Sequence, residues 1–246
     1  IRFTDTGIFD AEATNELMQR ELSKHEYAVI PGFYGARPDG TIKTFSRGGS
    51  DITGSIVARA VGAELYENWT DVSGFLVVDP RIVENPRTIH TITYRELREL
   101  SYMGATVLHE DAIFPVSACG IPINIRNTNK PEAEGTMIVA SGEGGGRDGV
   151  VTGIAGKRNF SVITLEKDMM NIERGFGRRV LSVLEEEGIS FEHLPTGIDT
   201  MSIVVADKEL DGKLEHVLEG IRSQAHPDSI DVQRDMALIA VVGRSM

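Results

Sequence analysis

The sequence has a single cysteine, no long apolar run and no surplus of positive charge. One cysteine, Cys119, excludes a disulfide within the chain, and we expect it to be a small, buried apolar side chain. No apolar run approaches the ~18 residues that a membrane-spanning helix needs, so we expect neither a membrane span nor a signal peptide. The formal net charge of −12 argues against a nucleic-acid partner, because phosphates favour a basic surface. Together these absences predict a cytoplasmic protein.

The 246 residues, of which 41% are hydrophobic, suffice for a buried core in one large domain or two. Residues 29–51 hold the most informative pattern. An apolar pair at 29–30 predicts the end of a strand, a tight turn follows at 38–40, and residues 41–45 alternate as a returning strand does. Residues 47–51, Arg-Gly-Gly-Ser-Asp, then precede an apolar periodicity that predicts a helix.

A glycine pair at the start of a helix lets main-chain N–H groups approach an anion, and the helix dipole adds roughly half a positive charge there. Arg47 contributes a planar fork of donors that suits carboxylate or phosphate oxygens. The simpler alternative is an ordinary turn in which Ser50 caps the helix. The pattern therefore favours, without requiring, a site for a small anionic ligand.

Polar residues also follow the next predicted strand, at residues 65–69. Thr70 and Asp71 come directly after it, and Arg81 comes after a second apolar stretch at 73–78. Ligands of open α/β sheets bind at the carboxyl ends of the strands, where these side chains could hydrogen-bond a nucleotide. The alternative is a plain strand end, a turn residue and a solvated arginine.

The segment at residues 141–149 contains five glycines and almost no apolar residue. This density predicts a flexible linker and a domain boundary; a phosphate-cradling loop is the sharper alternative, but no helix with a Lys-Ser/Thr start follows. Beyond the linker we expect the split βαβ arrangement of strand, helix, strand, strand, helix and strand. The predicted strands are 150–155, 161–165, 189–194, 201–205, 230–233 and 236–242, and the predicted helices are 175–187 and 210–221.

Six short motifs occur in a telling order along the chain. They are Pro-Gly-Phe-Tyr-Gly at 31–35, Ser-Arg-Gly-Gly-Ser-Asp at 46–51, Trp-Thr-Asp-Val at 69–72, Asp-Pro-Arg at 79–81, Gly-Ala-Thr-Val-Leu-His at 104–109 and Pro-Glu-Ala-Glu-Gly-Thr at 131–136. This series resembles the aspartokinases of the amino-acid kinase family over essentially the whole chain. The resemblance implies an α/β fold: the C-terminal part of an amino-acid kinase αβα sandwich, followed by an α+β, ferredoxin-like ACT regulatory domain.

The same resemblance implies domain boundaries and an activity. Residues 1–140 would be the C-terminal part of the kinase domain, 141–149 the linker and 150–246 an ACT region, with an inner ACT unit at about 160–235 and an incomplete outer unit. The implied activity is phosphorylation of the side-chain carboxylate of L-aspartate by ATP with Mg²⁺, giving 4-phospho-L-aspartate. This reaction is the first step of lysine, threonine and methionine biosynthesis.

The residue roles that the resemblance implies fall into two groups. Arg47 and Asp51 would be the catalytic pair and would hold L-aspartate together with Phe33 and Ser50. Thr70, Asp71 and Arg81 would hold the nucleotide.

Three positions depart from the pattern of the family. Leu76 stands where a tyrosine is common, Thr106 where a lysine often meets phosphate, and Glu110 where a proline follows the histidine. Thr106 is therefore not a predicted ligand. We expect His109 to be a packing residue, because phosphoryl transfer in this class depends on positioning and charge neutralisation. The Lys-Phe-Gly-Gly-Ser/Thr loop that usually opens these kinases is absent. A fragment without a complete active site is therefore expected.

An effector site is expected at the turn before the helix at 175–187. The residues assigned to it are Met170, Glu173, Gly175 and Phe176, together with Ser190, Phe191 and Glu192. An acidic lining suits lysine better than an uncharged effector such as threonine, and the resemblance to lysine-sensitive aspartokinases points the same way; the alternative is a solvated acidic face. ACT units usually pair edge to edge, because an open strand invites another chain, so a homodimer is expected.

Two other functions fit the sequence. The chain could be a non-catalytic amino-acid-binding and dimerisation module, as the absent opening loop and Thr106 allow. It could also be a kinase of the same fold that acts on glutamate or a nucleoside monophosphate, although the ACT-like tail counts against that alternative.

Overall fold

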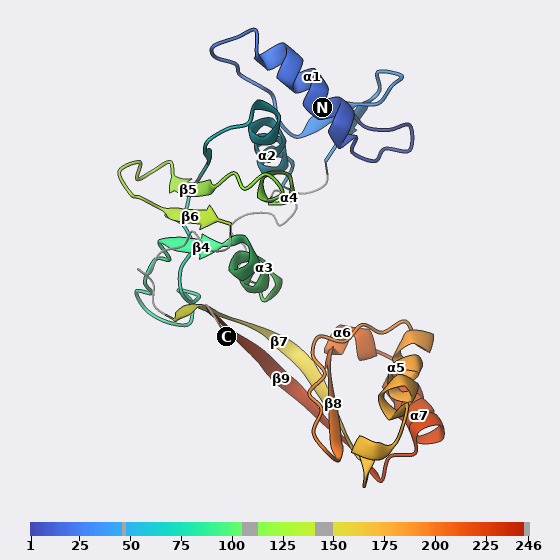
Figure 1. The fold of residues 1–246 in the computed structure, drawn as a ribbon. Coiled ribbons are helices and arrows are strands. Elements are labelled where there is room, and N and C mark those ends of the chain that lie inside the picture. The colour runs from blue at the N-terminus through green and yellow to red at the C-terminus, as the bar shows by residue number, and fades with distance from the viewer. Residues whose placement is uncertain (46–47, 105–112, 141–149, 244–246) are drawn as a thin grey trace. The chain divides into compact units, whose positions relative to one another are not determined.

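The computed structural model describes residues 1–45, 48–104, 113–140 and 150–243, and the chain divides into two compact units (Figure 1). Unit 1 comprises Ile1–Ala155 and Ala240–Met246, and unit 2 comprises Gly156–Ile239. The long strands β7 (Val151–Glu166) and β9 (Ser229–Gly243) contribute residues to both units. Within these described ranges, no helix has the length and apolar character needed to cross a membrane.

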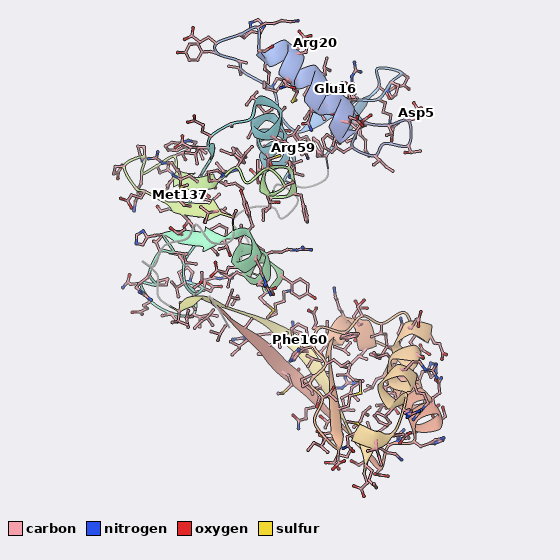
Figure 2. All side chains as sticks on the ribbon, in the orientation of Figure 1. Asp5, Glu16, Arg20, Arg59, Met137 and Phe160 are labelled. Atoms are coloured by element: carbon pink, nitrogen blue, oxygen red, sulfur yellow. The ribbon has the colours of Figure 1, made fainter. Side chains whose placement is uncertain are left out.

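Unit 1 begins with helix α1 (Ala11–Leu22), which packs against helix α2 (Gly49–Val61). The side chain of Asp10 caps α1 by accepting the main-chain N–H of the third residue after it, which satisfies a donor that has no partner within the helix. Glu16 and Arg20 lie on the exposed face of α1 (Figure 2). The helix therefore presents charge to solvent and its buried face to α2.

A small hairpin separates α1 from α2. Its strands, β1 (Tyr34–Ala36) and β2 (Ile42–Thr44), pair antiparallel, so the returning strand expected at 41–45 is confirmed. The strand end expected at 29–30 is wrong. Val29 is fully exposed, Ile30 is only partly buried, and neither belongs to a strand, so this apolar pair gains too little burial to favour a strand.

The main sheet of unit 1 has four strands in the order β3-β5-β6-β4. The strands are β3 (Tyr66–Thr70), β4 (Thr91–Thr93), β5 (Ile123–Asn127) and β6 (Thr136–Val139). β3 is parallel to β5 and β4 is parallel to β6, while β5 and β6 are antiparallel. The strand expected at 65–69 is thus present as β3, shifted by one residue.

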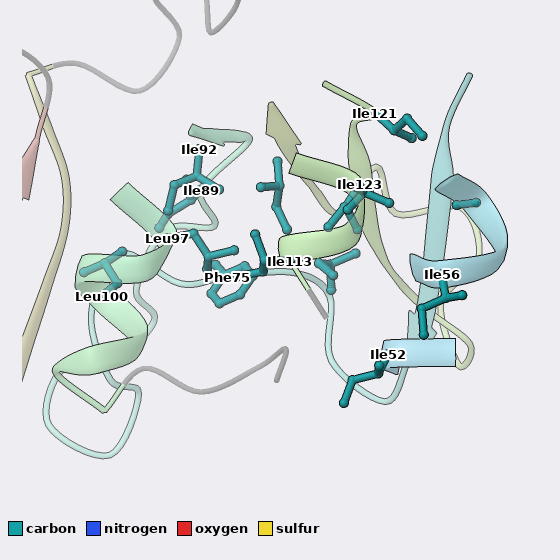
Figure 3. Close-up of a cluster of buried hydrophobic side chains, with 14 of the residues drawn as sticks. Ile52, Ile56, Phe75, Ile89, Ile92, Leu97, Leu100, Ile113, Ile121 and Ile123 are labelled. Atoms are coloured by element: carbon teal, nitrogen blue, oxygen red, sulfur yellow. The ribbon is translucent and has the colours of Figure 1, made fainter. Parts of the chain in front are cut away.

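The core of unit 1 lies between this sheet and its helices (Figure 3). Helix α3 (Tyr94–Tyr102) contributes Leu97 and Leu100, and the short helix α4 (Phe114–Ser117) packs against α2. Thr93 caps α3 in a reciprocal capping box with Glu96. A set of fully buried aliphatic and aromatic side chains fills the space, including Ile56, Phe75, Ile89, Ile92, Ile123, Ile125 and Ile138.

The apolar stretch at 73–78 makes only an isolated bridge between Leu76 and Thr88, and Gly74, with a φ of 95°, turns the chain there. The expected burial of Cys119 is wrong. Cys119 is exposed rather than buried, because it lies in the turn that follows α4. An apolar character alone does not predict burial in a turn.

Unit 2 is an antiparallel sheet covered by two helices. The sheet has the order β8-β7-β9, with β8 (Thr200–Ala206) antiparallel to β7. Helices α5 (Phe176–Glu186) and α7 (Leu214–Ala225) pack against each other, and a 3₁₀ turn (Met170–Ile172) and the short α6 (Asp207–Leu210) connect the elements. Its core includes the fully buried Ile163, Val180, Val205, Val217 and Ile221.

The boundaries in this part of the chain differ from the expected ones in three ways. The strands expected at 150–155 and 161–165 are one continuous β7, and those at 230–233 and 236–242 are one β9. Residues 189–194 make only an isolated bridge, from His193 to Val204 of β8. The helix expected at 210–221 starts later, because Gly212 adopts a φ of 72° that ends α6.

Candidate functional site

The entry to α2 is built by a close approach of two main-chain segments. Phe33 has a φ of 81°, and its N–H donates to Thr53 Oγ1 at 3.0 Å, while Thr53 Oγ1 donates to the carbonyl of Gly49 at 2.7 Å. A Cβ on Gly49 would lie 2.6 Å from the ring of Phe33. Glycine is therefore required at this position by packing, and the half-exposed Phe33 ring sits against the first turn of α2.

The first turn of α2 has no side-chain cap. Gly48 is the N-cap residue with a φ of 74°, and Ser50 is exposed without capping the helix, so the alternative in which Ser50 caps it does not hold. Uncapped N–H groups at a helix N-terminus are suited to an anion. Arg47, the residue expected to bind that anion, lies outside the described residues.

Asp51, by contrast, is held in place on the same turn. Its Oδ1 accepts the Nδ2–H of Asn68 at 3.1 Å, and its main-chain carbonyl accepts the hydroxyl of Tyr66 at 3.2 Å. Asn68 Nδ2 also donates to Tyr66 Oη at 3.0 Å. Burial raises the pKa of Tyr66 to about 12, and the charge of Asp51 acts in the same direction, whereas the hydrogen bond from Asn68 opposes it.

Thr70 is the last residue of β3, two positions beyond Asn68, and Asp71 follows it directly. The Thr70 carbonyl accepts both the N–H and the hydroxyl of Thr128, at 2.8 and 2.9 Å, which ties this strand end to the end of the parallel strand β5. Thr70 Oγ1 and Asp71 Oδ1 are 3.2 Å apart in a hydrogen bond. Of the residues expected to bind nucleotide, these two therefore lie at the end of the strand that contacts Asp51.

Arg81 lies in the turn that follows Asp79 and is paired with it. Its Nη2 is 2.6 Å from Asp79 Oδ2, and its Nε is 3.0 Å from both carboxylate oxygens. The guanidinium holds the pKa of Asp79 below its usual value, and the carboxylate raises the pKa of Arg81. The arginine side chain is 87% exposed, so a phosphate could replace this weakly held neighbour.

Three residues near Asp51 and Thr70 were not predicted from the sequence. They are Tyr66 and Asn68 on β3, and Asn127, which is buried on β5 and donates to Ser73 Oγ at 2.8 Å. A signal for the first two existed, since Tyr66, Asn68 and Thr70 alternate with Glu67 and Trp69 and so share one face of the strand. In the part of the chain that the structure describes, no group of three or more His, Cys, Asp or Glu side chains could hold a metal ion.

The residues expected to bind the effector fall into two groups in unit 2. Met170 and Phe176 are buried beside Gly175, which has a φ of 80° and starts α5. Glu173 is ion-paired with Arg179 and lies 4.0 Å from Lys167, so its charge is already compensated.

The second group follows the other end of α5. Ser190 and Phe191 are exposed, and Glu192 donates its N–H to the carbonyl of Val204 in β8 at 2.8 Å. The 11 residues of α5 separate the two groups, a length of about 16 Å at the rise of an α-helix. One chain therefore does not gather all the expected effector residues.

The class of protein follows from unit 1: an α/β sheet with a glycine-started, uncapped helix and polar strand ends at its carboxyl edge, as in proteins that bind small anionic ligands. The sequence profile of the amino acid kinase family matches residues 4–127. The chain belongs to the amino acid kinase family.

Individual relatives agree with this assignment. "Aspartokinase 3" of Bacillus subtilis (strain 168) is 48% identical over 219 residues, which cover 89% of this chain and 48% of the relative. The crystal structure of Clostridium acetobutylicum aspartate kinase is 57% identical, with a TM-score of 0.88 over 99% of this chain and 56% of that chain. Escherichia coli aspartokinase III in complex with lysine and aspartate is 28% identical, with a TM-score of 0.71 over 98% of this chain and 55% of that one.

These matches confirm the resemblance to aspartokinases and the expected fold class. The chain spans about half the length of the relatives that it matches.

Proposed function

We propose that this chain is part of an aspartate kinase, which transfers a phosphoryl group from ATP to the side-chain carboxylate of L-aspartate and produces 4-phospho-L-aspartate. The observation that carries the proposal is the arrangement at the start of α2: an uncapped glycine start and an oriented Asp51 carboxylate, beside Thr70 and Asp71 at the end of β3. The identity to an aspartate kinase over nearly the whole chain supports the choice of substrate.

In this proposal the amino-acid substrate meets two kinds of group. The N–H groups of the first turn of α2 and the guanidinium of Arg47 suit its carboxylates, whereas the Asp51 carboxylate suits its ammonium group. Phe33 and Ser50 border the same turn. Catalysis then consists of holding the attacking carboxylate oxygen in line with the phosphorus and compensating the charge that develops.

The nucleotide would lie beyond the end of β3. Thr70 and Asp71 offer a hydroxyl and a carboxylate there, and Arg81 can exchange its exposed partner Asp79 for a phosphate. ATP would supply the transferred phosphoryl group, with Mg²⁺ bound chiefly by phosphate oxygens and water, as this ion prefers. That mode fits a chain whose described residues contain no cluster of metal-ligating side chains.

Regulation by an amino acid, with lysine as the first choice, is the second part of the proposal. It is supported by the structural likeness to Escherichia coli aspartokinase III in complex with lysine and aspartate. Because the two groups of expected effector residues lie at opposite ends of α5, we propose that two copies complete the site between them. A cytoplasmic homodimer is therefore part of the proposal.

A non-catalytic amino-acid-binding and dimerisation module is the second candidate. The observation that favours it is that unit 2 has a hydrophobic core of its own. Under this alternative, lysine would bind and ATP would not.

Calorimetric titration of the chain with L-aspartate, ATP with Mg²⁺, and lysine tests the proposal directly. Binding of aspartate and nucleotide is expected, and both should weaken in Arg47→Ala and Asp51→Ala. Turnover in a coupled assay, with the chain joined to the rest of its kinase domain, would establish the substrate. Lysine binding without any nucleotide binding would favour the module instead.

A further inference from the structure

We infer that Asn68 is a positioning residue that orients the Asp51 carboxylate toward the ammonium group of the substrate, with Tyr66 as its support. The inference rests on the proposed function and concerns the same site. Asn68 stands on β3 and Asp51 in the first turn of α2, so the hydrogen bond between them links the two elements, as does the bond from the Tyr66 hydroxyl to the Asp51 carbonyl.

The amide of Asn68 has one orientation available. An ionised carboxylate only accepts hydrogen bonds, so the NH₂ group must face Asp51 Oδ1, which lies 3.1 Å from Nδ2. The second N–H of the same group is used by Tyr66 Oη at 3.0 Å. With both donors occupied, the amide cannot rotate without losing two hydrogen bonds.

Tyr66 closes the arrangement into a ring of three residues. Its hydroxyl donates to the main-chain carbonyl of Asp51 at 3.2 Å and accepts from Asn68. Because the hydroxyl stays protonated far above neutral pH, it remains a donor under all working conditions. Gly54 makes room for the ring, since a Cβ there would lie 2.5 Å from Tyr66 Oη.

The consequence for Asp51 is that its two oxygens differ. Oδ1 is used by Asn68, whereas Oδ2 has no hydrogen-bond partner among the residues that the structure describes. A carboxylate fixed in this way presents one oxygen to a ligand in a defined direction and loses little side-chain freedom on binding. Asn68 should therefore favour acids that carry an ammonium group over acids that lack one.

The test compares L-aspartate with succinate, which has the same two carboxylates and no ammonium group. Asn68→Ala should raise the Kd for L-aspartate about tenfold, as expected for a charge-assisted hydrogen bond, and should leave the Kd for succinate unchanged. Asn68→Asp keeps the shape of the side chain but replaces the donor with an acceptor. It should raise the Kd for L-aspartate at least as much as Asn68→Ala does.

Asn124→Ala is the matched control. Asn124 lies on the neighbouring strand β5, where Ile125 is the residue paired with Asn68. Because side chains alternate along a strand, Asn124 lies on the face of the sheet opposite to Asn68. This variant removes the same amide group from the same part of the sheet. It should leave both dissociation constants unchanged.

A measurement without ligand separates this inference from the proposed function. Three-bond NMR couplings of Asp51 report its χ1 rotamer, which should be single in the parent chain and averaged in Asn68→Ala. If the parent chain binds no L-aspartate, the proposed function fails for this chain, and the couplings still decide the role of Asn68. Unchanged couplings in Asn68→Ala would overturn the inference, as would an equal loss of L-aspartate and succinate affinity.

Discussion

Replacing Gly54 with alanine sets two physical effects against each other at the centre of the proposed site. Gly54 lies inside α2, where alanine is intrinsically better than glycine by about 1 kcal/mol. A Cβ at this position would, however, lie 2.5 Å from Tyr66 Oη and 2.8 Å from two ring carbons. The sign of the change in stability depends on which effect is larger.

The packing effect should win. Relieving contacts of 2.5 to 2.8 Å requires the Tyr66 ring to move away from α2, and overpacking of this kind costs about 1–3 kcal/mol. The movement also weakens the hydrogen bonds of Oη to the Asp51 carbonyl and to Asn68, at about 1 kcal/mol each. After the gain in helix propensity is subtracted, Gly54→Ala should lower the free energy of unfolding by about 2–4 kcal/mol.

The single tryptophan of the chain reports this transition. Trp69 lies on β3, is 42% exposed, and has the guanidinium of Arg126 4.7 Å above its ring. Unfolding of unit 1 in urea should therefore change its fluorescence. The measured quantity is the shift of the urea midpoint at constant slope, which separates a change in stability from a change in the unfolded state.

The Tyr66→Leu background supplies the decisive comparison. Leucine lacks the hydroxyl and the two ring carbons that alanine at position 54 would contact, so Gly54→Ala should there become stabilising by about 1 kcal/mol. Gly177→Ala in α5 is an independent gauge of propensity, since its Cβ would lie 3.8 Å from Met201, an ordinary contact. If Gly54→Ala were neutral or stabilising in the parent chain, the packing argument would be refuted.

Three further predictions concern single positions. The pKa of Tyr66 is raised to about 12, so the neutral hydroxyl stabilises the fold below pH 10 and this contribution should be lost between about pH 10 and 12. Over that range the free energy of unfolding should fall by about 2 kcal/mol more than in Tyr66→Phe, as measured by urea unfolding at each pH. An equal fall in both proteins would contradict this prediction. Gly135→Ala should prevent unit 1 from folding, as judged by circular dichroism, because its Cβ would lie 1.9 Å from the carbonyl oxygen of Ile125. Gly40→Ala is the control: Gly40 also has a positive φ but has open space around it, so this variant should lower the free energy of unfolding by only about 1 kcal/mol. Cys119 should react with a thiol reagent in the native state about as fast as in urea, because it is exposed; protection of this thiol would show that the turn after α4 is covered.

Local patterns predicted the elements of this fold better than their ends. The helix expected at 175–187 and the strand expected at 201–205 are present as α5 and β8, since each packs against a single core. The continuous β7 and β9 were each predicted as two strands. Their polar middle residues interrupt the apolar pattern, and each strand has one residue with positive φ at that point, Asn159 at 69° and Asp235 at 58°.

The candidate site shows the same limit at the level of side chains. Gly48, Gly49 and Asp51 could be assigned from sequence because they lie within four successive residues, and the helix start alone dictates their arrangement. Asn68 is 17 positions away from Asp51 and meets it only when β3 packs beneath α2. Nothing in the local sequence distinguishes this asparagine from a solvated one. The side chain that orients a predicted site residue can therefore be identified only from the tertiary structure.

Charged residues predicted from a motif differ in how readily they can change partners. The side chain of Arg81 is 87% exposed and is paired with Asp79. An exposed pair of this kind contributes little to stability, so a phosphate can replace Asp79 as the partner of Arg81. Glu173 has a side chain only 35% exposed and is shared by Arg179 and Lys167. A cationic effector would have to displace two tethered cations to reach it, and each of them is already held at high effective concentration by the chain. The proposed nucleotide contact is therefore compatible with the observed pairing, whereas Glu173 is better suited to fixing the turn before α5 than to binding the effector.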